Sequence, residues 1–410
     1  FLKQLLHENT SHKRLASGTR SLQLRSQRGT DLLPQPADRN CTEEQPDVMV
    51  VSGDIYHYST PSAATQKMYT DGLLRIHQAC PSMTIVVTAG NHDSSSKLEI
   101  DSNLWDHFRV KVIGHIERCG SAVNWEKQII TIPGQDGNPV GYIAAMPHVY
   151  PQNFPILSDD TPREERQSRF FQALLDETGK QNTQQLPVVL MAHLSVESSD
   201  RTGQDDSAGG MEFISLSTLG KGYDYLALGH IHCPQTLKGS ENHARYCGTP
   251  LPVSFDETYP HSVTIVQIRH QGEQPEITTR SIRNPWPLLT IPDTPVPFDE
   301  ALKALETYPD HEQTYIRLNV LIRDYLAPDC NEKASAATRG KACRFCYIKC
   351  TREQQEQATP EAALTIQEVK EMSPLDIAKR YYREAEGEEM DEELCTLMQE
   401  VITQVHAKDI

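Results

Sequence analysis

The chain is 410 residues long, with 38% hydrophobic and 23% charged residues, and it carries a formal net charge of −17 at pH 7. These proportions are typical of a folded globular protein and exclude a wholly disordered chain. The negative charge argues against a surface coated in positive charge for non-specific nucleic-acid binding, although divalent metals or a partner subunit can supply positive charge locally.

The sequence also indicates a compartment. It contains no apolar run long enough to cross a bilayer, and Phe1 to Gln4 does not open a recognisable signal peptide. Its ten cysteines are scattered rather than set in the dense framework of a disulfide-rich protein, which suits a reducing environment. We therefore expect a cytoplasmic protein with no membrane partner.

Residues 1–41 differ in character from the rest of the chain. From Lys13 to Asn40 five arginines are opposed by only two aspartates, and neither helical nor strand periodicity persists. Two interpretations are open for this segment. It is a flexible or disordered basic arm, or it is a truncated or frame-shifted start that replaced an ordinary first strand and helix.

Strands and helices alternate through residues 42–284, which predicts an α/β domain made of layered sheet with helices on its faces. Pro81 ends the first predicted helix of this domain. We predict helices over about 62–79 and 162–178, and strands over 47–51, 83–87, 110–113, 127–132, 140–146, 188–192, 262–268 and 276–282.

Two further segments follow the α/β domain. Pro285 and Pro287 predict a linker, because proline breaks any element that crosses it. Residues 285–359 then predict a small α+β domain that caps the first and helps to recognise DNA, with helices near 298–307 and 332–341 and strands near 314–322 and 345–351. Residues 360–410 are acidic and helical, and their apolar stripe from Leu394 to Val405 fits either core packing or docking of a partner coiled coil.

Four predicted strands each end in a residue that can bind a metal. The strand at 47–51 leads to Gly53-Asp54, and the strand at 83–87 leads to Gly90-Asn91-His92-Asp93. The strand at 188–192 leads to His193, and a fourth predicted strand, Tyr223 to Leu228, leads to Gly229-His230-Ile231-His232. A lone aspartate after a strand is usually a turn former, and a lone histidine is usually a surface or core residue. Four such endings together predict a metal centre at the rim of a sheet, where ligand chemistry collects in α/β proteins.

The residue types indicate how such a centre works. Asp54 suits a bridge between two metals because a carboxylate has two oxygens to share, and Asn91, His193 and His230 complete one metal site. His232 faces the other metal if the backbone there is extended. This mixed nitrogen and oxygen set fits manganese or iron better than calcium. His92 directly follows a ligand and can protonate a leaving alkoxide without binding metal itself.

These motifs resemble those of the calcineurin-like metallophosphoesterases, and within them the SbcD family of bacterial nuclease subunits. Further segments carry the resemblance, which covers about Thr42 to the C-terminus: Asn91 to Glu99, Gly209 to Glu212, Asp224 to His232, and Tyr246 to Phe255 with Glu257. The resemblance implies a β-sandwich core, a cap and a helical tail, with Asp54, Asn91, His193, His230 and His232 as metal ligands and His92 as the catalytic histidine.

The same resemblance implies an activity and partners. SbcD-type proteins are manganese-dependent exonucleases on duplex ends and endonucleases on single strands, and they act in DNA repair and recombination. They use two divalent metals, and they work as a homodimer within a heterotetramer that includes an SbcC-type coiled-coil ATPase docked on the C-terminal helices. The expected partners of this chain are therefore DNA and such an ATPase.

One departure from the family pattern affects the expected activity. The family opens with a strand ending in Asp-x-His, which supplies two ligands to the first metal. Here His12 is the nearest candidate for the histidine, and Thr10 then stands at the aspartate position. A neutral hydroxyl is a poor ligand for manganese, so only the second metal site looks complete. We expect weak or absent nuclease activity, with a non-catalytic scaffold subunit and a phosphatase of the same superfamily as alternatives.

Other potential ligands have ordinary explanations. Cys343 and Cys346, with Cys330 and Cys350, could form a zinc site, but their spacing is irregular and the neighbouring residues favour a strand with cysteines in the core. His57 and His148 follow motifs near the predicted rim. Either could reach the rim of the site or lie at the surface, and we favour surface histidines.

Overall fold

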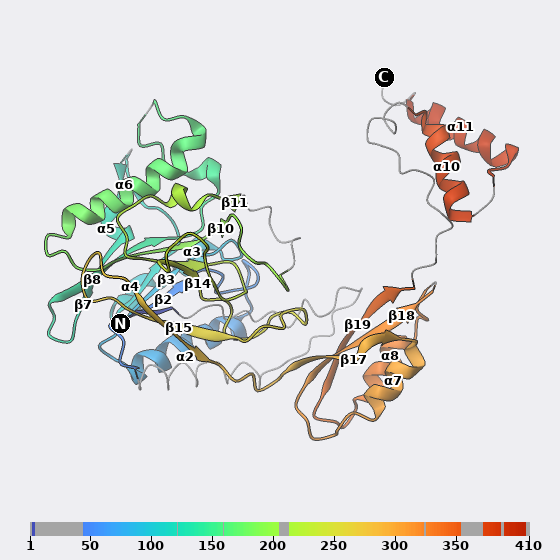
Figure 1. Ribbon diagram of the computed structural model, residues 1–410, viewed down its shortest axis with the longest axis horizontal. Coiled ribbons are helices and arrows are strands. Elements are labelled where there is room, and N and C mark those ends of the chain that lie inside the picture. Colours follow the sequence, from blue (N-terminus) through green and yellow to red (C-terminus); the bar gives the residue numbers. More distant parts are fainter. Residues whose placement is uncertain are drawn as a thin grey trace. The chain divides into compact units, whose positions relative to one another are not determined.

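The computed structural model describes residues 2–4, 44–120, 122–158, 160–204, 213–323, 325–353, 372–386 and 389–406. The chain forms two compact units, Phe1–Thr351 and Arg352–Ile410 (Figure 1). The predicted domain boundaries after residues 41 and 359 lie outside the described residues, as do His12 and the motif Gly209 to Glu212.

Two six-stranded sheets form the centre of the first unit. The first has the order β16-β15-β1-β2-β3-β4. Strands β1 to β4 run parallel, with Leu2 paired to Val48 and Val48 paired to Thr84, whereas β15 and β16 are antiparallel. The bounds are β1 (Leu2–Gln4), β2 (Val48–Ser52), β3 (Thr84–Thr88), β4 (Val110–Ile113), β15 (Ser262–Gln267) and β16 (Glu276–Ser281).

The second sheet has the order β13-β14-β12-β9-β8-β7. Its four central strands are parallel, which sets Gly229 opposite His193 at their carboxyl ends, and its two edge strands are antiparallel. The bounds are β7 (Ile129–Pro133), β8 (Pro139–Met146), β9 (Val188–His193), β12 (Tyr225–Gly229), β13 (Gln235–Thr236) and β14 (Ala244–Tyr246).

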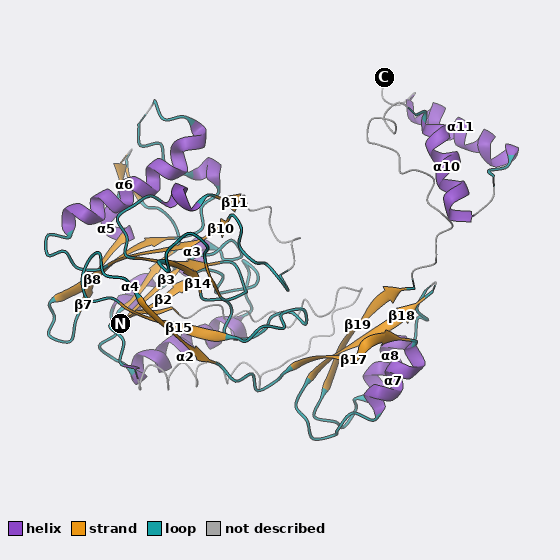
Figure 2. Ribbon diagram, viewed as in Figure 1, coloured by secondary structure: helices purple, strands orange, loops and turns teal. Residues whose placement is uncertain are grey.

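The sheets pack face to face, and helices cover their outer faces. Alternate residues of β2 divide between two cores, because Val48 and Val50 face the second sheet while Met49 packs under a helix. That helix is α2 (Ala63–Ala79), and α6 (Arg166–Gln181) covers the other sheet (Figure 2). This four-layer α/β arrangement confirms the predicted sandwich flanked by helices.

Shorter elements connect these layers. Seven of them had no counterpart in the sequence prediction, because a pattern of two to five residues is too short to show a period. They are α3 (Ser95–Leu98), α4 (Ser102–Asp106), α5 (Trp125–Gln128), β5 (Arg118–Cys119), β6 (Ala122–Val123), β10 (Ser195–Val196) and β11 (Phe213–Ile214), and single turns of 3-10 helix lie at Pro151–Asn153, Arg163–Glu165 and Leu216–Leu219.

A three-stranded sheet with two helices follows. Its order is β17-β18-β19, and α7 and α8 share its core with Ile316, Leu318 and Val320. The sequence prediction missed β17, because its two prolines argue against a strand. Proline is tolerated on β17 because this is an edge strand. The bounds are β17 (Leu288–Val296), α7 (Phe298–Glu306), β18 (Tyr315–Ile322), α8 (Cys330–Ala337) and β19 (Arg344–Arg352).

In its described residues the second unit has two helices that contact each other, α10 (Pro374–Glu386) and α11 (Glu392–His406). Ile377, Tyr381, Leu397 and Val401 are exposed on them. Among the described residues, no helix of either unit combines the length and the apolar character that a bilayer-spanning segment needs.

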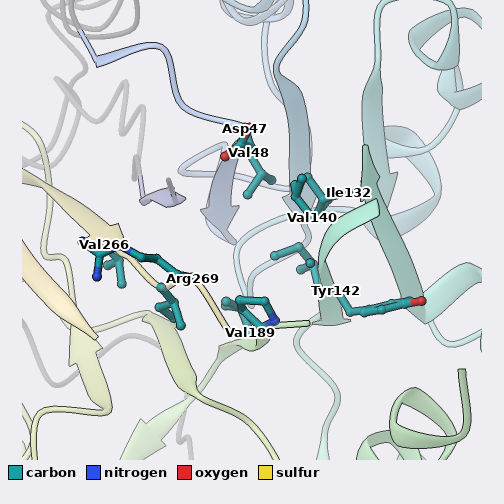
Figure 3. Close-up of a pocket in the computed structure, with 12 residues that line it drawn as sticks. Asp47, Val48, Ile132, Val140, Tyr142, Val189, Val266 and Arg269 are labelled. Atoms are coloured by element: carbon teal, nitrogen blue, oxygen red, sulfur yellow. The ribbon is translucent and has the colours of Figure 1, made fainter. Parts of the chain in front are cut away.

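A cavity of about 150 Å³ lies between the two large sheets. Val48, Val140 and Val189 line it, and each is the first or second residue of its strand (Figure 3). The polar residues that follow the strands therefore lie toward the opposite edge of the sandwich. This cavity is not part of the site described next.

Candidate metal centre

The carboxyl ends of β2, β3, β9 and β12 bring four of the predicted ligands together. Asp54, His193 and His230 are buried, and each offers an atom within 4.8 Å of the others, the only such group of three or more His, Cys, Asp or Glu side chains in the described part of the chain. Asn91 joins them through its amide oxygen, which lies 3.0 Å from His193 Nε2 and 3.2 Å from His230 Nδ1. The donors converge on one point from four strands.

His193 is held so that Nε2 faces this point. Its Nδ1–H donates to the carbonyl oxygen of Ser52 at 2.7 Å, which fixes the ring orientation. Nε2 lies 3.2 Å from Asp54 Oδ2. Burial alone would lower the pKa of His193, but the charge and hydrogen bond of Asp54 outweigh it and raise the pKa. A site that draws a proton to Nε2 in this way also attracts a metal cation in its place.

Tight backbone turns make the convergence possible. Asp54 has a φ of 53° and His230 a φ of 95°, in a region that non-glycine residues seldom adopt and that often marks functional sites. Gly90 passes so close to Asp54 that an added Cβ would collide with the Asp54 backbone nitrogen and Oδ1. Only glycine therefore allows the turns after β2 and β3 to meet.

Asp93 ties these two turns to each other. Its carboxylate accepts backbone N–H groups from Ile55 at 3.0 Å, from Tyr56 at 2.8 Å and from Gly90 at 2.8 Å. Burial, and then the charge of Asp54, raise the pKa of Asp93 to about 6, while the three donors act in the opposite direction. Asp93 belongs to the motif Gly90-Asn91-His92-Asp93, but its role could not be predicted from the sequence, because the segments it joins are distant in sequence.

His92 lies beside Asp54 with one ring nitrogen already occupied. Its backbone N–H donates to Asp54 Oδ1 at 2.9 Å, and its Nδ1–H donates to the carbonyl oxygen of His57 at 2.9 Å. The His57 and His92 rings stack with centroids 5.5 Å apart. Nε2 of His92 is thus the nitrogen left to exchange a proton with a substrate.

The expectation that His57 and His148 are surface residues was wrong. The His57 residue is only 7% exposed, beneath the His92 ring. His148 is half-buried, its ring centroid lies 6.2 Å from that of His193, and its backbone N–H donates to Ala89 at 2.8 Å. Burial, and then the neighbouring His193, lower the pKa of His148 to about 4. Both histidines surround the candidate centre.

His232 stands outside the converging group. Its Nδ1–H donates to Glu257 Oε1 at 2.8 Å, which fixes the direction of the ring. Glu257 is buried. In the sequence it was one of the residues that carry the family resemblance, and no role was predicted for it. The other candidate for a first metal, His12, lies outside the described residues, so the described ligands form one group and His232 remains apart.

The cysteines of the small domain are not gathered around a metal. Cys330 and Cys343 are buried in its core, Cys346 packs against Phe255 and Tyr315, and Cys350 is exposed. Within the described ranges none of them belongs to a cluster with metal-binding geometry.

Comparison with known proteins places this site in a family. The family model for calcineurin-like phosphoesterase matches residues 30–234, and a second model, described as the type 5 capsule protein repressor C-terminal domain and labelled SbcD_C, matches residues 284–386. The first match covers the four strand ends that carry the candidate ligands.

Individual relatives agree with these matches. The SbcD subunit of the SbcCD nuclease from Escherichia coli K12 is 23% identical over 88% of each chain, and the protein of the same name from Bacillus subtilis 168 is 26% identical over 90% of each. A solved dimetal phosphatase from Danio rerio is 12% identical, with a TM-score of 0.34, over 68% of this chain and 98% of its own. On its family match, the chain belongs to the calcineurin-like phosphoesterases, with the SbcD resemblance that its motifs predicted.

Proposed function

We propose that this protein is a metal-dependent nuclease that cleaves DNA as a double-strand exonuclease and a single-strand endonuclease, in DNA repair and recombination. Relatives named as the SbcD subunit of the SbcCD nuclease support this, because they match over most of both chains. The observation that carries the proposal is the convergence of Asp54, Asn91, His193 and His230, with His92 beside them.

The donor set fits a divalent transition metal. One carboxylate, one amide oxygen and two imidazoles suit manganese better than calcium, and we propose that these four residues hold one manganese ion. An ion at the first metal site would use Asp54 together with His232 and His12. When bound, such ions polarise a phosphoryl oxygen and lower the pKa of a coordinated water.

His92 supplies the protein's own acid chemistry. The His57 carbonyl holds Nδ1–H, so the ring presents Nε2 to the substrate in a fixed direction. A proton on Nε2 can pass to the leaving oxygen as the phosphodiester bond breaks. The contact between the His92 backbone N–H and Asp54 keeps this ring in register with the ligands.

Partners follow from the same proposal. DNA is the substrate, an SbcC-type coiled-coil ATPase docks on α10 and α11, and two copies of the chain form a dimer within that heterotetramer. The exposed apolar side chains of α10 and α11 support a docking role. Light scattering of the chain alone and with the ATPase tests the stoichiometry.

The direct test is cleavage of a circular single-stranded DNA by the full chain with Mn²⁺. This substrate has no free end and needs no ATPase. Because Thr10 stands at the aspartate position of the first metal site, we expect weak cleavage, and it should fall by about 10²–10⁴-fold in His92→Ala, the usual contribution of a positioned acid or base. His270→Ala is the matched control, because His270 is an exposed histidine remote from the ligands.

The outcomes separate the alternatives. Cleavage that disappears with His92 supports the nuclease. Hydrolysis of p-nitrophenyl phosphate without any DNA cleavage would replace the proposal with a phosphatase. A folded protein that binds the ATPase but has no activity on either substrate would replace it with a scaffold subunit.

A further inference from the structure

An ion pair between a buried arginine and a half-exposed aspartate joins the small α+β domain to the first domain. Arg317, on the middle strand β18, is only 4% exposed. Its guanidinium contacts both carboxylate oxygens of Asp256, at 2.8 and 3.0 Å. Such a bidentate contact fixes the orientation of the guanidinium relative to the carboxylate as well as the distance between them.

All three strands of the small sheet hold this arginine. Nε donates to Thr290 Oγ1 on β17 at 3.0 Å, and a terminal nitrogen donates to the Tyr347 hydroxyl on β19 at 3.2 Å. The guanidinium also lies 5.1 Å from the centre of the buried Phe255 ring. Arg317 therefore moves with the small domain, and Asp256 follows it.

The residue after Asp256 contacts His232. The carboxylate of Glu257 accepts from His232 Nδ1 at 2.8 Å, from the Val253 backbone at 3.1 Å and from Thr249 Oγ1 at 3.4 Å. Asp256 and Glu257 are joined by one peptide bond, with Cα atoms ~3.8 Å apart, so a shift of the Asp256 backbone acts directly on Glu257. Because Glu257 sets the direction of the His232 ring, such a shift turns His232.

We propose that Arg317 is a positioning residue for His232, through which the small domain sets the orientation of this histidine at the metal centre. The inference rests on the proposed function in taking His232 as a metal ligand. It predicts that the small domain influences the first metal site without contacting the metal. Asp256 and Glu257 transmit that influence.

The test uses the full chain, prepared without metal and labelled with ¹⁵N-histidine. Two-bond ¹H–¹⁵N spectra report which ring nitrogen of His232 carries the proton, and His232→Gln assigns the signal. We expect the Nδ1–H tautomer of His232 in the unsubstituted chain and a mixture of the Nδ1–H and Nε2–H tautomers in Arg317→Lys. This substitution keeps the positive charge but loses the bidentate contact with Asp256. Asp256→Asn, at a half-exposed side chain, should show the same change if Arg317→Lys folds poorly.

Metal binding gives a second readout. We follow Mn²⁺ titration by electron paramagnetic resonance. We expect Mn²⁺ affinity at the first metal site to be about tenfold lower in Arg317→Lys, which is near the lower end of the loss in metal affinity when a ligand loses the group that orients it. Combining Arg317→Lys with Glu257→Gln should lower it no further than Glu257→Gln alone, because both act through one path.

Arg245→Lys is the matched control. Arg245 is partly buried and donates to Thr236 and Thr264, in the first domain and away from Glu257. An unchanged His232 spectrum in Arg317→Lys and Asp256→Asn would overturn the inference. The Arg317–Asp256 ion pair would then have only a structural role. If the unsubstituted chain neither binds Mn²⁺ nor cleaves DNA, the proposed function fails, while the metal-free spectra still decide the role of Arg317.

Discussion

His148 shows how a single side chain links the centre to stability. Its pKa of about 4 lies below the ordinary value of 6.5, so the folded protein keeps the ring neutral where the unfolded chain protonates it. Free energy of unfolding is therefore lost as the pH falls from about 6.5 to about 4, at no more than ~1.4 kcal/mol per pH unit.

This dependence predicts a measurable difference between two proteins. In metal-free samples, His148→Gln should lose less stability than the unsubstituted chain as the pH is lowered from 7 to 5. Urea unfolding at several pH values gives the two slopes. Equal slopes would show that His148 titrates normally.

Several site residues escaped prediction for a common physical reason. The ligands at the ends of strands could be read from the sequence because each follows an apolar run that ends in a polar residue. Three other features depend on contacts between distant segments. They are the burial of His57, the hydrogen bonds that Asp93 accepts from three backbone N–H groups, and the ion pair between Asp256 and Arg317. No local pattern marks such contacts.

At the scale of elements, the close approach of β12 to β2 sets the position of His230. Gly229 ends β12 opposite Ser52, and an added Cβ would collide with the Ser52 carbonyl oxygen. That carbonyl also receives Nδ1–H of His193. One methyl group at this position would therefore disturb two candidate ligands.

We expect Gly229→Ala to lower both the unfolding midpoint and Mn²⁺ binding. Gly179→Ala is a matched control, since Gly179 lies inside helix α6 with open space where the methyl group would go. That control should stabilise the protein, by about 0.5–1 kcal/mol, because glycine is unfavourable within a helix. Denaturant unfolding and metal titration of both variants check the pair, and full Mn²⁺ binding by Gly229→Ala would contradict the expectation.

Strands were predicted best where the sequence has a continuous apolar run. The predicted strands at 47–51, 83–87 and 188–192 correspond to β2, β3 and β9, because parallel strands buried on both faces are continuously apolar. β17 was missed because Pro292 and Pro295 argue against a strand, and only the pairing of that strand shows that it is an edge. Sheet order is a property of the folded chain and has no sequence period.

At the scale of the whole molecule, the C-terminal unit is a separate binding element in our proposal. Leu397 and Val401 on α11 are 56% and 47% exposed, at the spacing of one helical turn. Apolar side chains exposed in this way favour a partner helix over solvent.

We expect Leu397→Lys combined with Val401→Lys to weaken binding of the coiled-coil ATPase by at least tenfold while leaving Mn²⁺-dependent cleavage of single-stranded DNA unchanged. Thr396→Lys places one such positive charge at an exposed polar position of α11 and should bind normally. Calorimetry with the purified ATPase measures the affinity. Normal binding by the double variant would move the docking surface elsewhere.

The order of the candidate ligands along the chain has a consequence for synthesis. Asp54 is made early and His230 late, and their strands belong to different sheets. At ~5–20 residues per second, roughly ten to thirty seconds separate their emergence. Throughout that interval the nascent chain lies among ribosomal and messenger RNA without a complete centre, so the order of translation itself delays any hydrolytic activity until the core can close.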